Sequence, residues 1–138
     1  MKILDLLTQR RKTGNFGENE ACIFLKRNGY KILKRNYVAN GYEIDIVAEN
    51  SDYLVFVEVK TRTEGHENPK EPRPASSVTP EKQRKIISAA KAYIGFAHPK
   101  KQIRFDIIEV IASKDKKVKS FSHLIGAFNA DTAYRRTN

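Results

Sequence analysis

One strand-sized run, residues 53–61, constrains the fold of this chain most. It reads Tyr-Leu-Val-Phe-Val-Glu-Val-Lys-Thr and is apolar or β-branched except for a glutamate and a lysine two residues apart. Such a run is typical of a β-strand, and on a strand residues i and i+2 point to the same face. Glu58 and Lys60 therefore share a face, and burying them there costs several kcal/mol unless they are paired or bind a ligand.

The chain before this run predicts one helix and two strands. Apolar residues from Thr13 onward are spaced for an amphipathic helix that stops at Asn28-Gly29. Residues 30–38 and 42–48 alternate as strands around the turn signal Asn40-Gly41. Only four polar residues separate the second of these strands from the run, so the two should form an antiparallel hairpin.

The chain after this run predicts a loop, a helix and two more strands. Residues 63–80 hold four of the five prolines, which favours a loop. Thr79 suits the N-cap of a helix over 80–96. A strand at 103–112 should lie parallel to the run, since a strand, a crossover helix and a strand form the usual right-handed unit, and 118–124 should form a short edge strand. The predicted order is α-β-β-β-α-β-β, an α/β fold with a central mixed β-sheet flanked by helices.

The length and composition favour one domain without a membrane span. The 138 residues fit a single unit, which we divide into an N-terminal extension (1–12), an α/β domain (13–128) and a C-terminal tail (129–138). No apolar stretch approaches the roughly 20 residues that cross a bilayer. Met1 to Leu7 lacks the features of a secretory signal, so we expect a cytoplasmic protein. A single cysteine excludes an intramolecular disulfide and a Cys-rich zinc site.

The net charge of +10 is unevenly distributed along the chain. Residues 1–40 carry +6, residues 41–68 carry −5 and residues 69–138 carry +9. The basic flanks favour an anionic partner such as nucleic acid. The acidic segment, residues 41–68 (called the acidic island below), would repel phosphate unless it recruits divalent cations. Solvated hairpin and loop charges are the equally plain alternative.

The predicted hairpin brings Asp45 alongside Glu58 and Lys60. Two carboxylates there could hold a hard cation through oxygen ligands, with the Val59 carbonyl as a further ligand. The lysine could orient or deprotonate an attacking water. In this second strand we expect Ile44 and Ile46 on one side and Asp45 on the other.

A simple salt bridge between Glu58 and Lys60 on a wet face is the alternative interpretation. With 10 Glu and 16 Lys in the chain, chance alone predicts about one Glu-x-Lys triplet, so the triplet by itself has no weight. The apolar strand around it supplies the weight.

Several short sequence motifs resemble those of the YraN family. They occur in the same order as in that family and span about residues 13–128. That family is similar to archaeal Holliday-junction resolvases and to restriction-endonuclease-like nucleases with a D…E-x-K signature. One departure is Tyr42, where the family usually has a glycine. The matching motifs are Gly17-Glu18 with Ala21 and Phe24-Leu25, Gly29-Tyr-Lys-Ile-Leu33, Arg35-Asn36, Gly41 to Ala48, Val55 to Arg62, Lys82 with Lys85-Ile86, Ala90 and Tyr93, and Arg104-Phe-Asp106.

The resemblance implies a restriction-endonuclease-like fold and a Mg²⁺- or Mn²⁺-dependent phosphodiesterase site. Asp45, Glu58 and Lys60 would form that site, with Glu18 as a fourth member. Duplex or branched DNA would be the substrate, and a homodimer is implied by the same analogy. A non-catalytic nucleic-acid-binding module and a protein-interaction domain that suits an anionic surface are the competing hypotheses.

Other residues have plainer expectations. Arg62, Lys82 and Lys85 could follow a phosphate backbone, although a solvated helix face explains the lysines nearly as well. Cys22 suits a small core residue. Asp106 is expected to pair with Arg104 in a structural role. The three histidines, which have no zinc spacing, are expected at the surface or at caps: His66, His98 and His123.

Overall fold

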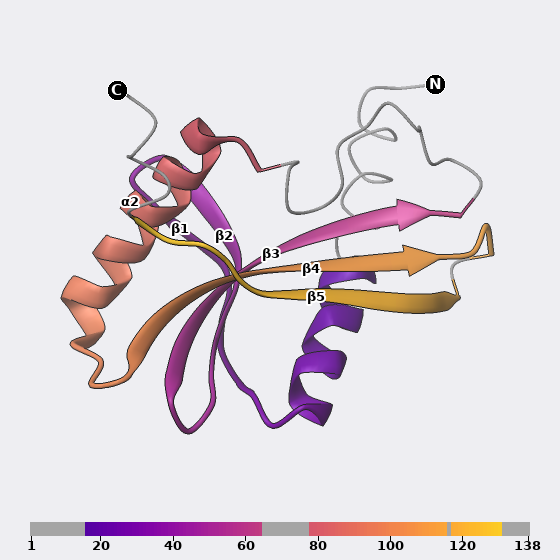
Figure 1. The fold of residues 1–138 in the computed structure, drawn as a ribbon, viewed down its shortest axis with the longest axis horizontal. Coiled ribbons are helices and arrows are strands. Elements are labelled where there is room, and N and C mark those ends of the chain that lie inside the picture. Colours follow the sequence, from indigo (N-terminus) through magenta and orange to yellow (C-terminus); the bar gives the residue numbers. More distant parts are fainter. Residues whose placement is uncertain (1–15, 65–77, 116, 131–138) are drawn as a thin grey trace.

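The predicted order of elements is confirmed. The computed structural model describes residues 16–64, 78–115 and 117–130 (Figure 1). Residues 16–27 are helical and are called the first helix below. The N-terminal extension, most of the proline-rich loop and the tail beyond residue 130 lie outside the described residues. The other elements are β1 (Lys31–Ala39), β2 (Tyr42–Glu49), β3 (Tyr53–Thr63), α2 (Pro80–Ala97), β4 (Gln102–Ala112) and β5 (Val118–Phe128).

The strands form one five-stranded mixed sheet in the order β1-β2-β3-β4-β5. β3 pairs in parallel with β4, and the other neighbours are antiparallel. The parallel pairing is possible because α2, which lies between the two strands in sequence, returns the chain to the edge of the sheet where β3 began. β3 is therefore the central strand, and it holds Glu58 and Lys60.

The prediction that the last strand ends near residue 124 is wrong. β5 has eleven residues and continues along β4 past a shift in register between Phe105 and Ile107. Gly126 lies in the left-handed region with φ of +62° at this irregularity, so the chain bends there without leaving the sheet.

Each face of the sheet is covered by one helix. One core cluster joins Ile86, Ile87 and Tyr93 of α2 to Leu54 and Phe56 of β3. The other joins the first helix to the opposite face of the same strand. Figure 1 shows the two helices on different sides of a strongly twisted sheet. In the second cluster the contacts from the helix are Ala21, Cys22 and Leu25, packed with Val55 and Val57. Cys22 is thus a core residue, as expected, whereas the neighbouring Ile23 is 42% exposed.

The turns adopt the conformations that their residues favour. Asn40 and Gly41 have φ of +52° and +75°, as a type I′ hairpin turn requires. Gly29, with φ of +88°, ends the first helix, and Tyr30 N donates to Leu25 O over 3.0 Å. The Thr79 side chain caps α2 by accepting from Lys82 N at 3.2 Å.

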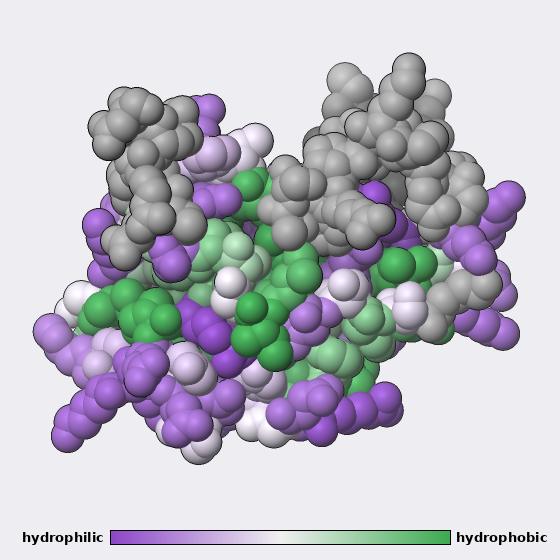
Figure 2. All heavy atoms as spheres, in the orientation of Figure 1, coloured by the Kyte–Doolittle hydropathy of each residue, from purple (hydrophilic) through white to green (hydrophobic). Residues whose placement is uncertain are grey.

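Among the described residues, no helix is long and apolar enough to cross a membrane. The surface is mixed: Figure 2 shows hydrophobic patches set among hydrophilic residues on one face. Among the residues that the structure describes, Phe96 is the most exposed large apolar side chain, at 84%.

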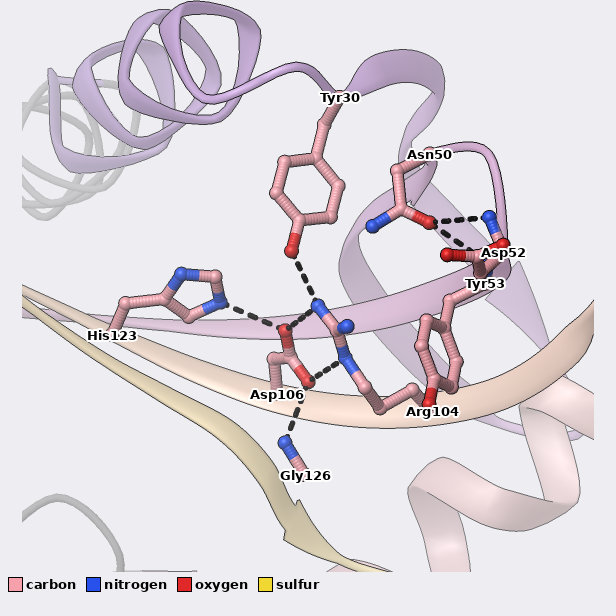
Figure 3. Close-up of polar contacts among 8 residues, drawn as sticks. All are labelled: Tyr30, Asn50, Asp52, Tyr53, Arg104, Asp106, His123 and Gly126. Carbon is pink, nitrogen blue, oxygen red and sulfur yellow. Dashed lines mark hydrogen bonds and ion pairs between the residues drawn. The ribbon is translucent and has the colours of Figure 1, made fainter.

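A buried polar cluster ties β4 to β5 (Figure 3). Asp106 is fully buried, and both of its carboxylate oxygens accept from Arg104, at 2.9 and 2.8 Å. Oδ2 also lies 2.7 Å from His123 Nε2, and Oδ1 accepts from Gly126 N at 2.9 Å. Tyr30 accepts a further hydrogen bond from Arg104, which links the cluster to the start of β1.

The cluster confirms the Arg104–Asp106 pair and corrects the placement of His123. His123 was expected at the surface or at a cap, but it lies within β5, and its side chain is only 11% exposed and faces Asp106. Burial alone would raise the pKa of Asp106, yet hydrogen bonds from His123 and Arg104 outweigh it and lower that pKa. The ionised carboxylate therefore stabilises the fold above pH 3.8, and this contribution is lost as the pH falls through the lower folded-state pKa.

We predict that Asp106→Ala lowers the free energy of unfolding by about 3–5 kcal/mol at pH 7, because it leaves the largely buried Arg104 without its carboxylate partner. Urea unfolding followed by circular dichroism measures this. Asp52→Ala, at an exposed connection, is the matched control and should change stability by less than about 0.5 kcal/mol. Equal effects of the two substitutions would contradict a structural role for the cluster.

Gly17 lets the first helix approach β3 closely. A Cβ atom at this buried position would overlap Oγ1 of Thr61 and lie 3.1 Å from its Cβ. Since Gly17 precedes Glu18 and Thr61 follows Lys60, the contact also fixes the start of the helix beside the predicted site.

Gly17→Ala should lower the free energy of unfolding by about 1–3 kcal/mol, because the added methyl group forces the helix and strand apart. Gly95→Ala in α2 is the control: nothing lies within 4 Å of its added methyl. It should raise stability by about 0.5–1 kcal/mol through helix propensity. Thermal unfolding distinguishes the two, and an unchanged Gly17→Ala protein would rule out the close contact.

Candidate active site on β2 and β3

The candidate site lies where the ladder between β2 and β3 ends. The last paired residues on this side are Ile46 and Val57, so Asp45 is the first residue of β2 beyond the ladder. Its Oδ2 accepts from the backbone N–H of Val59 at 2.8 Å. A carboxylate thus takes the place of a backbone acceptor, and this hydrogen bond joins the two strands at the site.

β2 changes face at Asp45. Ile44 packs in the cluster under α2, whereas Ile46 packs in the cluster under the first helix. The prediction that these two isoleucines share a side is therefore wrong. On the neighbouring strand Asn36, between the residues paired with Ile46 and Ile44, has φ of +53°. The irregular backbone aims the Asp45 carboxylate at the main chain of β3, which simple alternation would not do.

Glu58 is the most connected side chain of the site. It is only 10% exposed, and Oε1 lies 3.2 Å from Lys82 Nζ and 3.8 Å from Lys60 Nζ. Its Oε2 accepts from the Tyr42 hydroxyl at 3.3 Å. The carboxylate is therefore surrounded by two ammonium groups and a phenol, contributed by β3, α2 and β2.

Burial and crowding shift the pKa values of the acidic and basic groups here. Burial and then repulsion from Glu58 raise the pKa of Asp45 to about 7, against a weaker lowering by the Val59 N–H. Burial and the neighbouring Lys82 lower the pKa of Lys60. For Lys82 burial acts in the lowering direction, but contacts with Lys60 and Glu58 outweigh it and raise the pKa. Lys60 is thus the ammonium that gives up its proton more readily.

The donor set suits a hard divalent cation. Asp45 and Glu58 repel each other in a largely buried setting, and a cation between oxygen ligands would relieve that repulsion. The N–H of Val59 faces β2, and on a strand the N–H and C=O of one residue point to the same side, so its carbonyl is directed toward β2 as well.

Within the described residues no three His, Cys, Asp or Glu side chains are grouped to hold a metal ion. Asp45, Glu58 and the Val59 carbonyl could supply part of the shell of a Mg²⁺ ion, which usually keeps several water ligands.

Glu18 lies at the edge of the site. Its side chain is 14% exposed, and Oε2 lies 3.6 Å from Arg35 Nη2. The Asn36 amide, with its nitrogen turned toward the carboxylates, donates to Glu18 at 3.0 Å and to Glu43 at 2.8 Å. Burial raises the pKa of Glu18, and its charge contributes to raising that of Asp45. Glu18 is thus close enough to influence Asp45 and is held by residues of β1.

The three predicted phosphate contacts are placed differently from one another. Arg62, further along β3, forms an ion pair with the buried Glu109 of β4. Lys85 is exposed and lies 3.9 Å from Glu81, one turn earlier on α2. Lys82 contacts Glu58 and so belongs to the site itself. Lys82 and Lys85 also line a hollow of about 380 Å³, together with Asn40, Gly41, Tyr42, Thr79 and Glu81.

Two residues of the site were not found from the sequence. Tyr42 was noted only as a departure from a family pattern, yet its hydroxyl holds Glu58. Asn36 was quoted only as part of a matching motif, yet it lies between two carboxylates. Only their positions in the sequence could have indicated them. Both lie near the Asn40-Gly41 turn, Asn36 on β1 and Tyr42 at the start of β2, the strand that holds Asp45.

The fold and site together define a class: a mixed α/β sheet domain with an Asp, Glu and Lys constellation on adjacent central strands. The model of the uncharacterised protein family UPF0102 matches residues 17–110, and the chain belongs to this YraN-like family. It is 41% identical to a UPF0102 protein of Dictyoglomus thermophilum, over 86% of this chain and 98% of that protein. A UPF0102 protein of Chlorobaculum parvum is 42% identical, over 83% and 90% of the two chains. These names state a family and no activity.

The raised pKa of Asp45 predicts a pH dependence of stability in the presence of EDTA. The unfolded chain loses this proton near pH 3.8 and the folded chain near pH 7. Folding therefore becomes less favourable as the pH rises between these values. Asp45→Asn keeps an acceptor for the Val59 N–H and removes the charge, so it should be more stable than the parent by about 1–3 kcal/mol at pH 8. The difference should vanish near pH 4.

Urea unfolding at a series of pH values measures this difference, with the exposed Asp52→Asn as control. A stability difference that does not change between pH 4 and pH 8 would mean that folding does not raise the pKa of Asp45.

Proposed function

We propose that this protein is a divalent-metal-dependent DNA endonuclease that hydrolyses phosphodiester bonds. The observation that carries the proposal is the joining of Asp45, Glu58 and Lys60 at the end of the β2–β3 ladder, through the Asp45–Val59 hydrogen bond and the Lys60–Glu58 ion pair. A salt bridge alone would account for Glu58 and Lys60. It would not account for a second carboxylate, largely buried and repelled by the first, on the neighbouring strand.

Each residue has a role that follows from its surroundings. Asp45, Glu58 and the Val59 carbonyl would hold Mg²⁺ or Mn²⁺, which would polarise the phosphate and lower the pKa of a bound water. Lys60, whose pKa is lowered, would first release its ammonium proton to solvent and would then, as the neutral amine, accept the proton of the attacking water. The water oxygen forms a new bond to phosphorus, one P–O ester bond breaks, and the leaving alkoxide takes up a proton from solvent.

Charge outside the site supports a nucleic-acid substrate. The chain carries +10 overall, so its basic flanks would attract the phosphate backbone that the acidic island alone would repel. Duplex or branched DNA is the substrate class that we propose, and a homodimer would allow two strands to be cut.

The proposal predicts that the protein nicks supercoiled plasmid or a four-way junction in the presence of Mn²⁺ and not in EDTA. Asp45→Asn should lower the rate by about 10²-fold or more, because a metal ligand is lost, and Lys60→Met should do the same through loss of the proton acceptor. The control is Lys100→Met, an exposed lysine beyond the other end of α2, which should retain the parent rate. Gel electrophoresis of time courses measures these rates.

Two outcomes would overturn the proposal. Cleavage that persists unchanged in both site variants would point to a contaminant or to another site. Salt-dependent DNA binding without cleavage under any metal would favour the non-catalytic nucleic-acid-binding module instead.

A further inference from the structure

The Lys82 side chain can reach two places: the Glu58 carboxylate and a hollow beside the site. Its Nζ lies 3.2 Å from Glu58 Oε1, closer than Nζ of Lys60, which lies 3.8 Å from the same oxygen. The same side chain lines the hollow of about 380 Å³ between the β1–β2 turn and the start of α2. Lys82 is 32% exposed, so its ammonium group has access to solvent as well as to Glu58.

The Glu58 carboxylate cannot serve both Lys82 and a divalent cation equally well. An ammonium group 3.2 Å from a carboxylate oxygen neutralises it and competes for the same lone pairs. A cation at Asp45 and Glu58 would also repel two ammonium groups at this distance. Both lysines have the same flexible four-carbon chain, but Lys82 also lines the adjacent hollow and Lys60 does not, so Lys82 is the group that has a second place to go.

We propose that Lys82 is a two-state positioning residue: without a divalent cation it neutralises Glu58, and with the cation bound it turns into the adjacent hollow to contact a phosphate of the substrate. This rests on the proposed function and adds a substrate-binding role that depends on the metal. Lys85, which lines the same hollow but pairs only with the exposed Glu81 among the contacts described, would contact substrate phosphate in either state.

Metal binding by itself gives the first test. Titration calorimetry with Mn²⁺ and no DNA compares the parent protein with Lys82→Gln and Lys85→Gln. Because Lys82→Gln removes a competing positive charge, it should bind Mn²⁺ about three- to tenfold more tightly. Lys85→Gln should bind Mn²⁺ like the parent. Unchanged or weaker Mn²⁺ binding by Lys82→Gln would overturn the inference.

The dependence of DNA binding on salt gives the second test. Binding of a labelled four-way junction is measured from 50 to 200 mM salt (about the range over which such contacts respond), once in EDTA and once in saturating Ca²⁺, a hard cation with the same oxygen preference. Lys82→Gln should reduce the log-affinity against log-salt slope by about 0.9 in Ca²⁺ and leave it unchanged in EDTA. Lys85→Gln should reduce the slope in both.

The outcomes separate the inference from the proposed function. An equal loss of slope in EDTA and Ca²⁺ for Lys82→Gln would make Lys82 an ordinary phosphate contact and overturn the inference alone. Failure of the parent protein to bind Mn²⁺, with circular dichroism showing it folded, would overturn both. All variants change exposed or half-exposed positions of one helix, and matching thermal unfolding curves exclude a folding defect.

Discussion

The hydrogen bond from the Val59 N–H to the Asp45 carboxylate is the interaction on which the rest of the site depends. The β2–β3 ladder stops one residue earlier, so this backbone N–H would lose its partner if the side chain were removed. The same bond fixes the Asp45 carboxylate beside β3, where Glu58 and Lys60 stand immediately before and after Val59. The sheet therefore builds the site by ending a ladder early and replacing one backbone acceptor with an ionisable group.

Charge compensation explains why the site tolerates so many buried ionisable groups. Burial of the Asp45 carboxyl, and then repulsion from Glu58, raise the pKa of Asp45 to about 7. Lys60, Lys82 and Tyr42 offset the charge of Glu58 from three sides. The second cluster, around Asp106, solves the same problem differently: a bidentate arginine, a histidine and a backbone N–H satisfy one carboxylate completely and lower its pKa. A completely satisfied carboxylate suits structure, and one that is crowded and incompletely neutralised suits chemistry.

Local patterns predicted the fold well because each element carries its own signals. The Asn40-Gly41 turn, the Thr79 cap and the apolar run of β3 depend on neighbours in sequence, and all three were found. The length of β5, the burial of His123 and the change of face at Asp45 depend on neighbours in space. A bulge at Gly126 and a left-handed Asn36 shift the register and direction of strands, and period-two alternation contains no information on either. For the site, the hairpin rule placed Asp45 beside Glu58 and Lys60. The capture of Lys82 by Glu58 could not be predicted, since it depends on where α2 packs. The Tyr42 contact depends on the path of β2 beyond its ladder with β3.

The most direct test of the central claim is diffraction from a crystal soaked in manganese, recorded at the Mn absorption edge. We expect one or two anomalous peaks in contact with the carboxylates of Asp45 and Glu58 and the carbonyl of Val59. An occupied crystal in which manganese binds elsewhere, with Lys82 still paired to Glu58 and no density between the two carboxylates, would contradict it.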